Sequence, residues 1–263
     1  MRVTLLITCV VDVLAPDVGD ATVEVLQAAG CDVSCDLSQT CCGQPAWNAG
    51  FADEAAKVAR PTLAALEREL DAGAELVVAP AGSCATMVRR FWPEMFEVAG
   101  DPDAAERARR VGERTREVSE MVAPHVDRLG DLALDAPLRV ALHESCHLLR
   151  ELRVVEEPRR LLDAVAGCER VAWEGADRCC GFGGTFSVKL PETSVAMADE
   201  KLAALEQAAP DVVVGCDTSC LLHLQARAEE VGTPLRVRHV VEVLAEALRG
   251  DRTPAGTSDG DSA

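Results

Sequence analysis

An internal duplication marked by cysteines constrains this chain more than any other feature. Three landmarks recur with nearly the same shift, at offsets of 137, 138 and 136 residues: Cys9 as Cys146, Cys41-Cys42-Gly43 as Cys179-Cys180-Gly181, and Ser83-Cys84 as Ser219-Cys220. Chance placement of the twelve cysteines of the chain would rarely produce such a match. The repeat therefore indicates two copies of one structural unit.

Both copies show the same alternation of apolar runs and helical patterns. Short aliphatic runs, typical of buried parallel strands, stand before the repeated cysteines at 3–7, 32–37, 75–79, 138–142 and 211–215. Helical patterns separate or follow them at 17–29, 53–71, 84–98, 151–166, 192–208 and 219–231. This order is typical of doubly wound parallel sheets. We expect an α/β fold of two tandem, Rossmann-like domains related by a pseudo-twofold axis.

The domain boundaries follow from the repeat. We expect a first cysteine-rich domain at 1–130, which includes a linker helix at 103–129, and a second at 131–249. Residues 250–263 are rich in Asp, Gly, Ser and Thr, so they are expected to form a disordered tail.

Charge and hydropathy exclude several classes of protein. The formal net charge is −18, and an excess of carboxylates repels phosphate backbones, so we expect no nucleic-acid partner. No stretch of about 18 residues is apolar and uncharged, so no membrane span is expected. The N-terminus reads as a first strand rather than a signal peptide, which predicts a cytoplasmic protein. Cytoplasmic thiols stay reduced, and clustered cysteines there indicate metal or redox chemistry.

The repeated cysteines are the candidate ligands. In an open parallel sheet, ligands gather beyond the carboxyl ends of the strands. We therefore expect two sets of four thiolates, Cys9, Cys41, Cys42 and Cys84 in the first half and Cys146, Cys179, Cys180 and Cys220 in the second. Four thiolates suit tetrahedral zinc as well as an iron–sulfur cluster, but the long spacings favour a cluster. Buried structural pairs are a third interpretation.

Five segments closely resemble the lactate-utilisation protein A family, over about residues 1–248: 41–50, 80–84, 143–152, 179–186 and 217–223. That family belongs to a wider group with duplicated cysteine-rich CCG domains, which includes the B-type component of heterodisulfide reductase and the iron–sulfur component of glycolate oxidase. The resemblance implies one iron–sulfur cluster per half, of the 4Fe-4S type, held by the eight cysteines. Zinc in one half remains an alternative.

The resemblance also implies a function. Such a chain would be an electron-transfer subunit of a bacterial L-lactate-oxidising complex, working with a second iron–sulfur protein and a third component. It has no flavin or nicotinamide fingerprint, so we expect a non-autonomous subunit of an oxidoreductase rather than a complete enzyme. The alternatives are a redox subunit of the heterodisulfide reductase or glycolate oxidase type, and a zinc-stabilised scaffold.

One departure from the wider group concerns the ligand number. The heterodisulfide reductase relatives close each repeat with Cys-x-x-Cys, whereas Ala81 and Asp217 stand three residues before Cys84 and Cys220 here. Four ligands per half remain, and Cys216 is a candidate extra ligand in the second half. The other cysteines, Cys31, Cys35 and Cys168, are expected in the core, away from the carboxyl ends of the strands.

Three histidines near the second cysteine set are candidate hydrogen-bond donors to the ligands or packing residues: His143, His147 and His223. The segment 143–147 matches the zincin pattern H-E-x-x-H, but that motif works only on a helix, and a strand is expected to end near His143. Because the second half carries these histidines and the glycine-rich segment 181–184, we expect two unequal centres. The second-half centre is expected to have the higher reduction potential.

Overall fold

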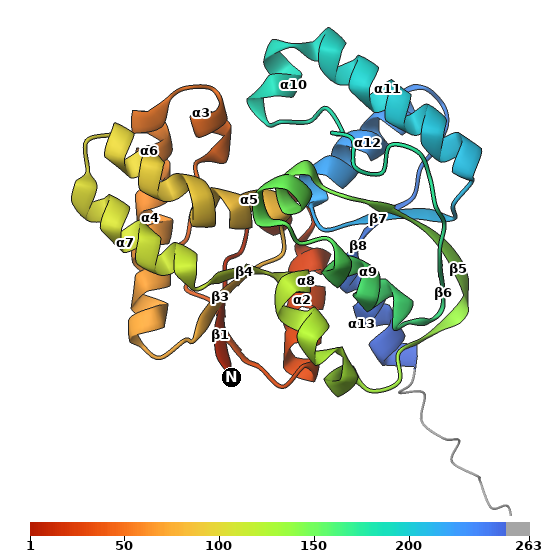
Figure 1. Ribbon diagram of the computed structural model, residues 1–263, viewed down its shortest axis with the longest axis horizontal. Helices are drawn as coiled ribbons and strands as arrows, with labels where there is room; N and C mark the ends of the chain where they lie inside the picture. Colours follow the sequence, from red (N-terminus) through yellow and green to blue (C-terminus); the bar gives the residue numbers. More distant parts are fainter. Residues whose placement is uncertain (251–263) are drawn as a thin grey trace, which may run out of the picture.

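The computed structural model describes residues 1–250 and consists of two four-stranded parallel sheets (Figure 1). Their strand orders are equivalent, β2-β1-β3-β4 and β6-β5-β7-β8. The strands are β1 (Arg2–Leu5), β2 (Asp32–Ser34), β3 (Leu76–Ala79), β4 (Thr115–Glu117), β5 (Ala133–His143), β6 (Ala166–Arg170), β7 (Val212–Gly215) and β8 (Val237–His239). The expected α/β fold of two doubly wound halves is confirmed.

Helices cover both faces of each sheet, as buried parallel strands require. In the first half they are α1 (Cys9–Leu14), α2 (Pro16–Ala28), α3 (Gln44–Asn48), α4 (Ala52–Asp71), α5 (Gly82–Thr86), the π-helix η1 (Met87–Phe91), α6 (Trp92–Val98), α7 (Pro102–Glu113), α8 (Val118–Val122) and the 3₁₀ helix η2 (Ala123–Leu129). In the second half they are the π-helix η3 (His147–Leu152), α9 (Glu156–Asp163), α10 (Thr185–Lys189), α11 (Pro191–Ala208), α12 (Thr218–Glu230) and α13 (Val240–Gly250).

The expected linker helix at 103–129 is wrong. The helix ends at Glu113, and residues Thr115–Glu117 form β4, which pairs in parallel with β3 through Val77↔Thr115 and Ala79↔Glu117. Pairing with the free edge of β3 overrides the local helical pattern here. The helix expected at 151–166 is also interrupted, because Arg153 adopts a left-handed conformation with φ +58° between η3 and α9.

The pseudo-twofold axis passes where β3 and β7 end. Ala81 forms an antiparallel bridge with Asp217, its counterpart at the 136-residue offset. The Gly82 N–H donates to the carbonyl oxygen of Cys216 at 3.0 Å, next to this bridge. The two halves therefore meet backbone to backbone at the carboxyl ends of equivalent strands, the place where the repeated cysteines were expected.

The halves also share a hydrophobic core. One cluster of buried side chains contains Val3 and Val78 from the first sheet together with Val140 and Val214 from the second. Helix α2 packs against α13, and Arg249 forms an ion pair with Glu24 across the same contact. The expected boundary at 130/131 falls between η2 and β5 and remains a prediction, since this core crosses it.

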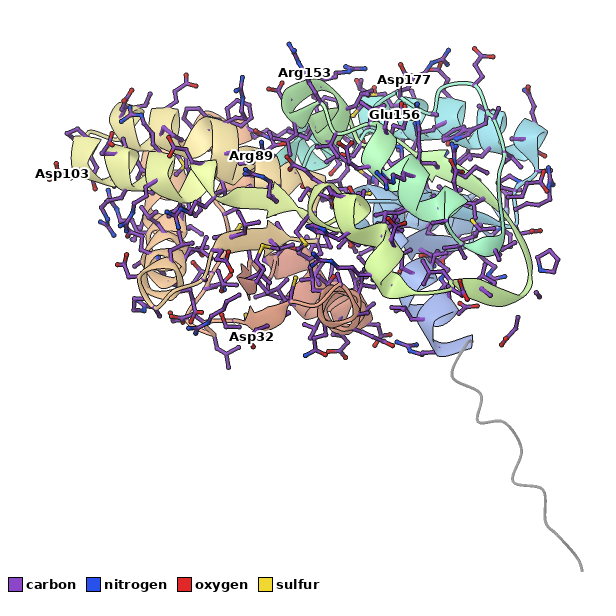
Figure 2. All side chains as sticks on the ribbon, turned by 60° about the horizontal axis from the view of Figure 1, so that its bottom comes forward. Asp32, Arg89, Asp103, Arg153, Glu156 and Asp177 are labelled. Atoms are coloured by element: carbon purple, nitrogen blue, oxygen red, sulfur yellow. The ribbon has the colours of Figure 1, made fainter. Side chains whose placement is uncertain are left out.

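Most charged side chains lie on the outside. The labelled acidic residues in Figure 2, Asp32 and Asp103 in the first half and Glu156 and Asp177 in the second, are all exposed. No helix among residues 1–250 is long and apolar enough to cross a membrane. Gly250 is the last residue of α13, and the rest of the expected tail, 251–263, lies outside the described residues.

Candidate metal centre

Helix starts position four of the eight repeated cysteines. Cys9 is the first residue of α1, and Cys84 lies in the first turn of α5. In the second half, Cys146 directly precedes η3 and Cys220 lies in the first turn of α12. Free backbone N–H groups at helix starts favour thiolates. The carboxyl ends of β1, β3, β5 and β7 thus deliver cysteines to sites that stabilise negative charge.

The adjacent pairs depend on the glycine that follows each of them. Gly43 has φ +85° and Gly181 has φ +92°, in the left-handed region that favours glycine. A Cβ at Gly43 would lie 2.6 Å from the carbonyl oxygen of Ala55, and one at Gly181 would lie 2.5 Å from that of Ser194. No other residue fits either position without displacing backbone. The glycine turns each Cys-Cys pair toward the neighbouring cysteines.

In the first half, the Sγ atoms of Cys9 and Cys41 lie 3.7 Å apart, and those of Cys42 and Cys84 lie 3.5 Å apart. A disulfide requires about 2.05 Å, whereas sulfurs around a tetrahedral metal with bonds of about 2.3 Å lie about 3.8 Å apart. Buried Trp92 fixes the pair by donating its indole N–H to the carbonyl oxygen of Cys42 at 2.8 Å. All twelve cysteines are free thiols.

The second half repeats the arrangement and places one backbone donor differently. The Gly181 N–H lies 3.4 Å from the Sγ of Cys179, as the Gly43 N–H lies 3.4 Å from the Sγ of Cys41. In addition, the Phe182 N–H lies 3.5 Å from the Sγ of Cys180. The first set has its second backbone donor elsewhere, from Val10 to Cys9, so the two sets differ in which cysteine receives it.

The pKa values of the thiols follow the same repeat. The Cys42 and Cys9 thiols and the Gly43 N–H lower the pKa of Cys41 to about 3. In the second half, the neighbouring Cys146 and Cys180 thiols lower the pKa of Cys179 to about 2. Hydrogen bonding to neighbouring cysteines and burial raise the pKa of the innermost thiols, Cys42 and Cys180. Each set therefore holds a ready thiolate, and the remaining thiols ionise when a cation supplies the compensating charge.

All eight cysteines line one cavity of about 180 Å³ between the two halves. Polar side chains from both halves complete its wall: Gln44, Asn48, Ser83, His147, Asp217 and Ser219. The two sets are thus not two remote sites but two walls of a single space. Eight free thiols converge in this way, and the two first-half Sγ distances suit bonds to a tetrahedral metal ion. This donor set fits the iron–sulfur or zinc centres expected from the sequence.

Contacts across the cavity hold the walls together. Gln44 donates from Nε2 to the carbonyl oxygen of Ser83 at 3.2 Å, and the same atom lies 3.3 Å from Nε2 of His147 in the other half. The Thr185 hydroxyl donates to the carbonyl oxygen of Pro45 at 3.2 Å. The last contact joins α3 to α10 where the two helices face each other in Figure 1, and the Gln44–His147 contact joins α3 to η3.

The three candidate histidines have different surroundings. His143 ends β5 rather than lying on a helix with His147, so the zincin interpretation is not supported. It is 2% exposed, and neither ring nitrogen has a hydrogen-bond partner. A ring nitrogen of His143 and the Sγ atoms of Cys180 and Cys220 all lie within 4.8 Å of one another. Burial lowers the pKa of His143 to about 3, which keeps the ring neutral and able to bind a metal.

Of the two other histidines, only His147 reaches the cavity. His147 lines the cavity, and its Nδ1 lies 3.7 Å from the Sγ of Cys146. His223 is not among the lining residues; its Nε2 lies 3.3 Å from the Ser194 hydroxyl and its ring packs on Phe182.

The structure does not bring Cys216 to the other cysteines. Its side chain is 1% exposed, lies beside Ser119 and Glu117, and does not line the cavity. Its position therefore contradicts the extra-ligand interpretation: the thiol belongs to the core between the halves. Cys35 directly follows β2 at its carboxyl end, which corrects the expectation for this residue, yet it contacts Gln39 rather than the cavity.

The remaining two cysteines also stay away from the cavity. Cys31 is buried in the shared core, and Cys168 lies half-buried within β6.

Two buried charged residues near the cavity had not been assigned a role from the sequence. Asp217 is 1% exposed and accepts from the Ser83 N–H at 2.8 Å and from the Ser219 hydroxyl at 2.5 Å. Lys201 is 2% exposed and lies on α11. The helical spacing of the sequence could have indicated that Lys201 is buried, because it lies on the face of α11 that packs inward and is usually apolar. The buried residues of this face are Ser194, Ala198, Lys201 and Leu205.

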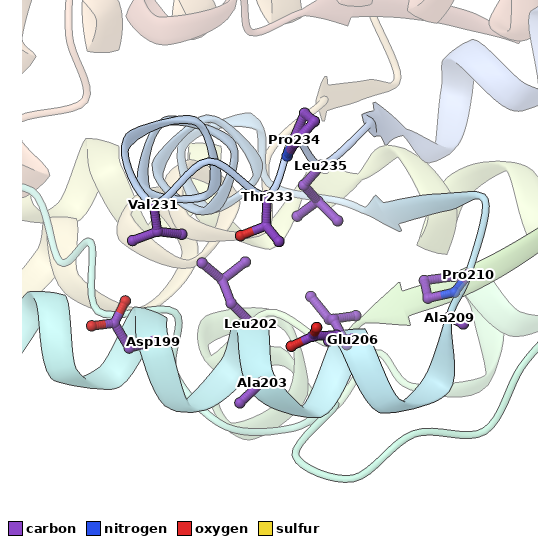
Figure 3. A pocket seen from close by; sticks show the side chains of 11 residues that line it. Asp199, Leu202, Ala203, Glu206, Ala209, Pro210, Val231, Thr233, Pro234 and Leu235 are labelled. Atoms are coloured by element: carbon purple, nitrogen blue, oxygen red, sulfur yellow. The ribbon is translucent and has the colours of Figure 1, made fainter.

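A second cavity, of about 370 Å³, lies on the outside of the second half (Figure 3). It is formed by α11, including Leu202 and Glu206, and by the segment 231–235 after α12. Its lining contains no cysteine or histidine.

Comparison with known proteins agrees with the repeat. The cysteine-rich domain family CCG matches the chain twice, at residues 3–89 and 140–225. Lactate utilization protein A of Geobacillus thermodenitrificans is 41% identical over 244 residues, covering 93% of this chain and 98% of the relative. Lactate utilization protein A of an Exiguobacterium species is 39% identical over 248 residues, covering 94% of this chain and 98% of the relative.

Among solved structures, an aspartate racemase homologue from Pyrococcus horikoshii is similar over 95% of this chain and 97% of its own, at 12% identity and a TM-score of 0.32, which is too low to support an inference. The sequence relatives are close and nearly full-length. The chain therefore belongs to the lactate utilization protein A family and carries two CCG cysteine-rich domains.

Proposed function

We propose that this chain is the iron–sulfur electron-transfer subunit of a bacterial L-lactate-oxidising complex in the cytoplasm. The observation that carries the proposal is the convergence of eight free cysteines, four from each half, on one cavity. Nearly full-length relatives named for lactate utilization supply the substrate class.

The two cysteine sets would hold one cluster each, Cys9, Cys41, Cys42 and Cys84 in the first half and Cys146, Cys179, Cys180 and Cys220 in the second. Bound iron–sulfur clusters supply one-electron redox chemistry. The chain's own residues bind and orient them: helix starts and glycine N–H groups stabilise the thiolates, and the buried cysteines Cys42, Cys180 and Cys220 exclude water from the inner wall.

Electrons would enter and leave through partners. Cys9 is the exposed member of the eight, so the first-half set reaches the surface, while the second-half set lies deeper. The sequence has no flavin or nicotinamide fingerprint, so we expect lactate oxidation to require the partner proteins, a second iron–sulfur protein and a third component.

The test is metal analysis on protein purified without oxygen. We expect iron and acid-labile sulfide in the amounts of two clusters per chain, and a brown protein whose colour bleaches on reduction. Zinc in place of iron, in a colourless protein, would overturn the proposal in favour of the zinc-stabilised scaffold.

A redox subunit of the heterodisulfide reductase or glycolate oxidase type is the second candidate. The shared cavity favours the first of these, because both cysteine sets face a space that a small disulfide could enter. Reduction of a low-molecular-weight disulfide by the isolated, chemically reduced protein would support it. Electron transfer only to a protein partner would support the lactate complex.

A further inference from the structure

Besides Asp217, which replaces Ala81 of the first half beside the cavity, the second half has a buried positive charge. Lys201 lies on α11, which corresponds to α4 of the first half. The contacts of Gly43 with Ala55 and of Gly181 with Ser194 relate these helices by 139 residues, from 194 − 55. The position in α4 that corresponds to Lys201 is therefore 62, from 201 − 139, and it is occupied by the neutral Thr62.

Both residues bind the backbone just before the cysteine pair. The Thr62 hydroxyl accepts from the N–H of Thr40, the residue before Cys41, at 2.8 Å. Lys201 Nζ donates to the carbonyl oxygen of Arg178, the residue before Cys179, at 2.7 Å. The same structural task is thus performed by a hydroxyl in one half and by an ammonium in the other.

The ammonium has no hydrogen left for the thiolates. Besides Arg178, it donates to the carbonyl oxygens of Gly175 at 2.6 Å and Ala176 at 3.2 Å, which uses all three N–H groups. Its Nζ also lies 4.7 Å from the centre of the Trp173 ring, whose own N–H is anchored on the carbonyl oxygen of Leu142 at 3.0 Å. Any effect of Lys201 on the cysteines is therefore exerted by its charge and by the loop that it holds.

That charge has no carboxylate within ion-pair distance among the described residues. Burial lowers the pKa of Lys201 to about 8, so the ammonium is mostly protonated at neutral pH. The negative groups that oppose this shift are Cys180, Cys220 and Cys179 when ionised, followed by the exposed carboxylate of Asp177. A buried charge without a partner is costly. Once a bound metal centre has ionised the cysteines of the second half, they are the partner that compensates Lys201, and Lys201 is in turn a positive charge beside that set.

A fixed positive charge favours the more negative state of a nearby redox centre. Reduction adds one electron to a cluster and makes it more negative, so a cation held close to it raises its reduction potential. The Phe182 N–H directed at Cys180 acts in the same direction. At the corresponding place of the first half, Thr62 contributes no charge.

We propose that Lys201 is a positioning residue for the second-half centre: it holds the loop that leads into Cys179-Cys180, and its charge sets this centre at a higher reduction potential than the first. This inference rests on the proposed electron-transfer function. Each electron that passes down this gradient oxidises the first-half centre by one equivalent and reduces the second-half centre by one. The exposed first-half centre then receives electrons from a partner and passes them to the deeper second-half centre.

The test compares Lys201→Met, which removes the charge, with Lys201→Arg, which keeps it. Lys57→Met is the matched control, since Lys57 is an exposed cation on α4. All are purified without oxygen and titrated electrochemically, with electron paramagnetic resonance to separate the centres. We expect Lys201→Met to lower the reduction equilibrium constant of one centre at least tenfold, which is about 59 mV for a one-electron couple. Lys201→Arg and Lys57→Met should stay close to wild type.

Two readouts keep the outcome decisive. Unshifted potentials in a Lys201→Met protein with full iron would overturn the role of Lys201 while leaving the proposed function intact. A wild-type protein without a reducible centre would instead overturn the proposed function. If Lys201→Met loses half of its iron, Lys201→Gln, which can still donate to the loop carbonyls, replaces it under the same criterion. Loss of second-half iron in both neutral variants, with retention in Lys201→Arg, would show that the charge is required.

Discussion

At the scale of single residues, the cysteines that line the cavity differ in their surroundings from the cysteines that lie in the core. Cys42 is 5% exposed and lies 3.5 Å from Cys84, whereas Cys168 sits in β6 away from the cavity. Replacing a ligand should remove a metal centre, and replacing a packing cysteine should cost only packing free energy.

Cys42→Ser should therefore remove about half of the iron and leave the second-half centre in place. Iron per chain and the resonance spectrum of the anaerobic protein measure this. Cys168→Ser is the control and should keep all the iron, with a loss of unfolding free energy on the order of 1 kcal/mol. Full iron content in Cys42→Ser would contradict the assignment of the first set.

Gly43 offers a test of the turn that follows the cysteine pair. Gly43→Ala should destabilise the protein more than Gly50→Ala, although both glycines have φ +85°. Both variants have the strain of a left-handed residue, about 1 kcal/mol, but only at Gly43 does the new Cβ meet a backbone oxygen, at 2.6 Å; around Gly50 there is nothing within 4 Å. Equal unfolding free energies, measured by denaturant titration, would show that the close approach to Ala55 is not maintained in solution.

At the scale of elements, the cavity is built by loops between regular structure. The segments 38–50 and 176–188 carry the two cysteine pairs, and short helices and turns make up most of both. Bound metal contributes its binding free energy to the order of such segments, whereas the sheets depend on buried aliphatic side chains such as Val77 and Val213.

Metal removal should therefore expose these two segments to proteases before the rest of the chain. We expect limited proteolysis of the apo-protein to cut within 38–50 and 176–188, with the far-ultraviolet circular dichroism largely retained. The metal-loaded protein serves as the control. Identical cleavage patterns in the two forms would rule out the coupling between metal and loop order.

The sequence predicted the elements that carry a strong local pattern. Aliphatic runs located β1, β3, β5 and β7, and the cysteine repeat located the cysteines that line the cavity, which remain candidate metal ligands. The three-residue strands β4 and β8 are too short to show a period, and they exist because the edges of β3 and β7 accept them. Lys201 and Asp217 escaped assignment because such side chains are ordinarily solvated, and only the tertiary structure shows them buried.

At the scale of the whole molecule, the halves are joined through a core that contains an ionisable group. Glu117, at the end of β4, lies fully buried beside Cys216 of the second half. Its Oε2 accepts from the Ser119 N–H at 2.8 Å, and its Oε1 has no hydrogen-bond partner. Burial raises the pKa of this carboxyl to about 8, so the folded protein holds it protonated at neutral pH.

This predicts a pH-dependent stability. Between the ordinary carboxyl pKa and about 8, the unfolded chain releases the proton and the folded chain retains it. The contribution of Glu117 to stability is therefore full below the unfolded pKa and is lost as pH rises toward 8, by up to about 1.4 kcal/mol per unit. Glu117→Gln should gain stability relative to wild type as pH rises from 5 to 8, measured by denaturant unfolding of the apo-proteins. A difference that does not change with pH would contradict the buried, protonated carboxyl.

The bridge between Ala81 and Asp217 has a consequence for how unlike the two halves can become. In a dimer of identical subunits, a residue next to the twofold axis meets its own copy, so a buried acid there would face a second acid. Covalent joining of two copies removes that restriction, and this chain sets an alanine opposite a single aspartate. The same freedom allows the second half to have Lys201 at the position where the first half has Thr62. Two equivalent sites can therefore carry different charges within one polypeptide, which strict twofold symmetry forbids.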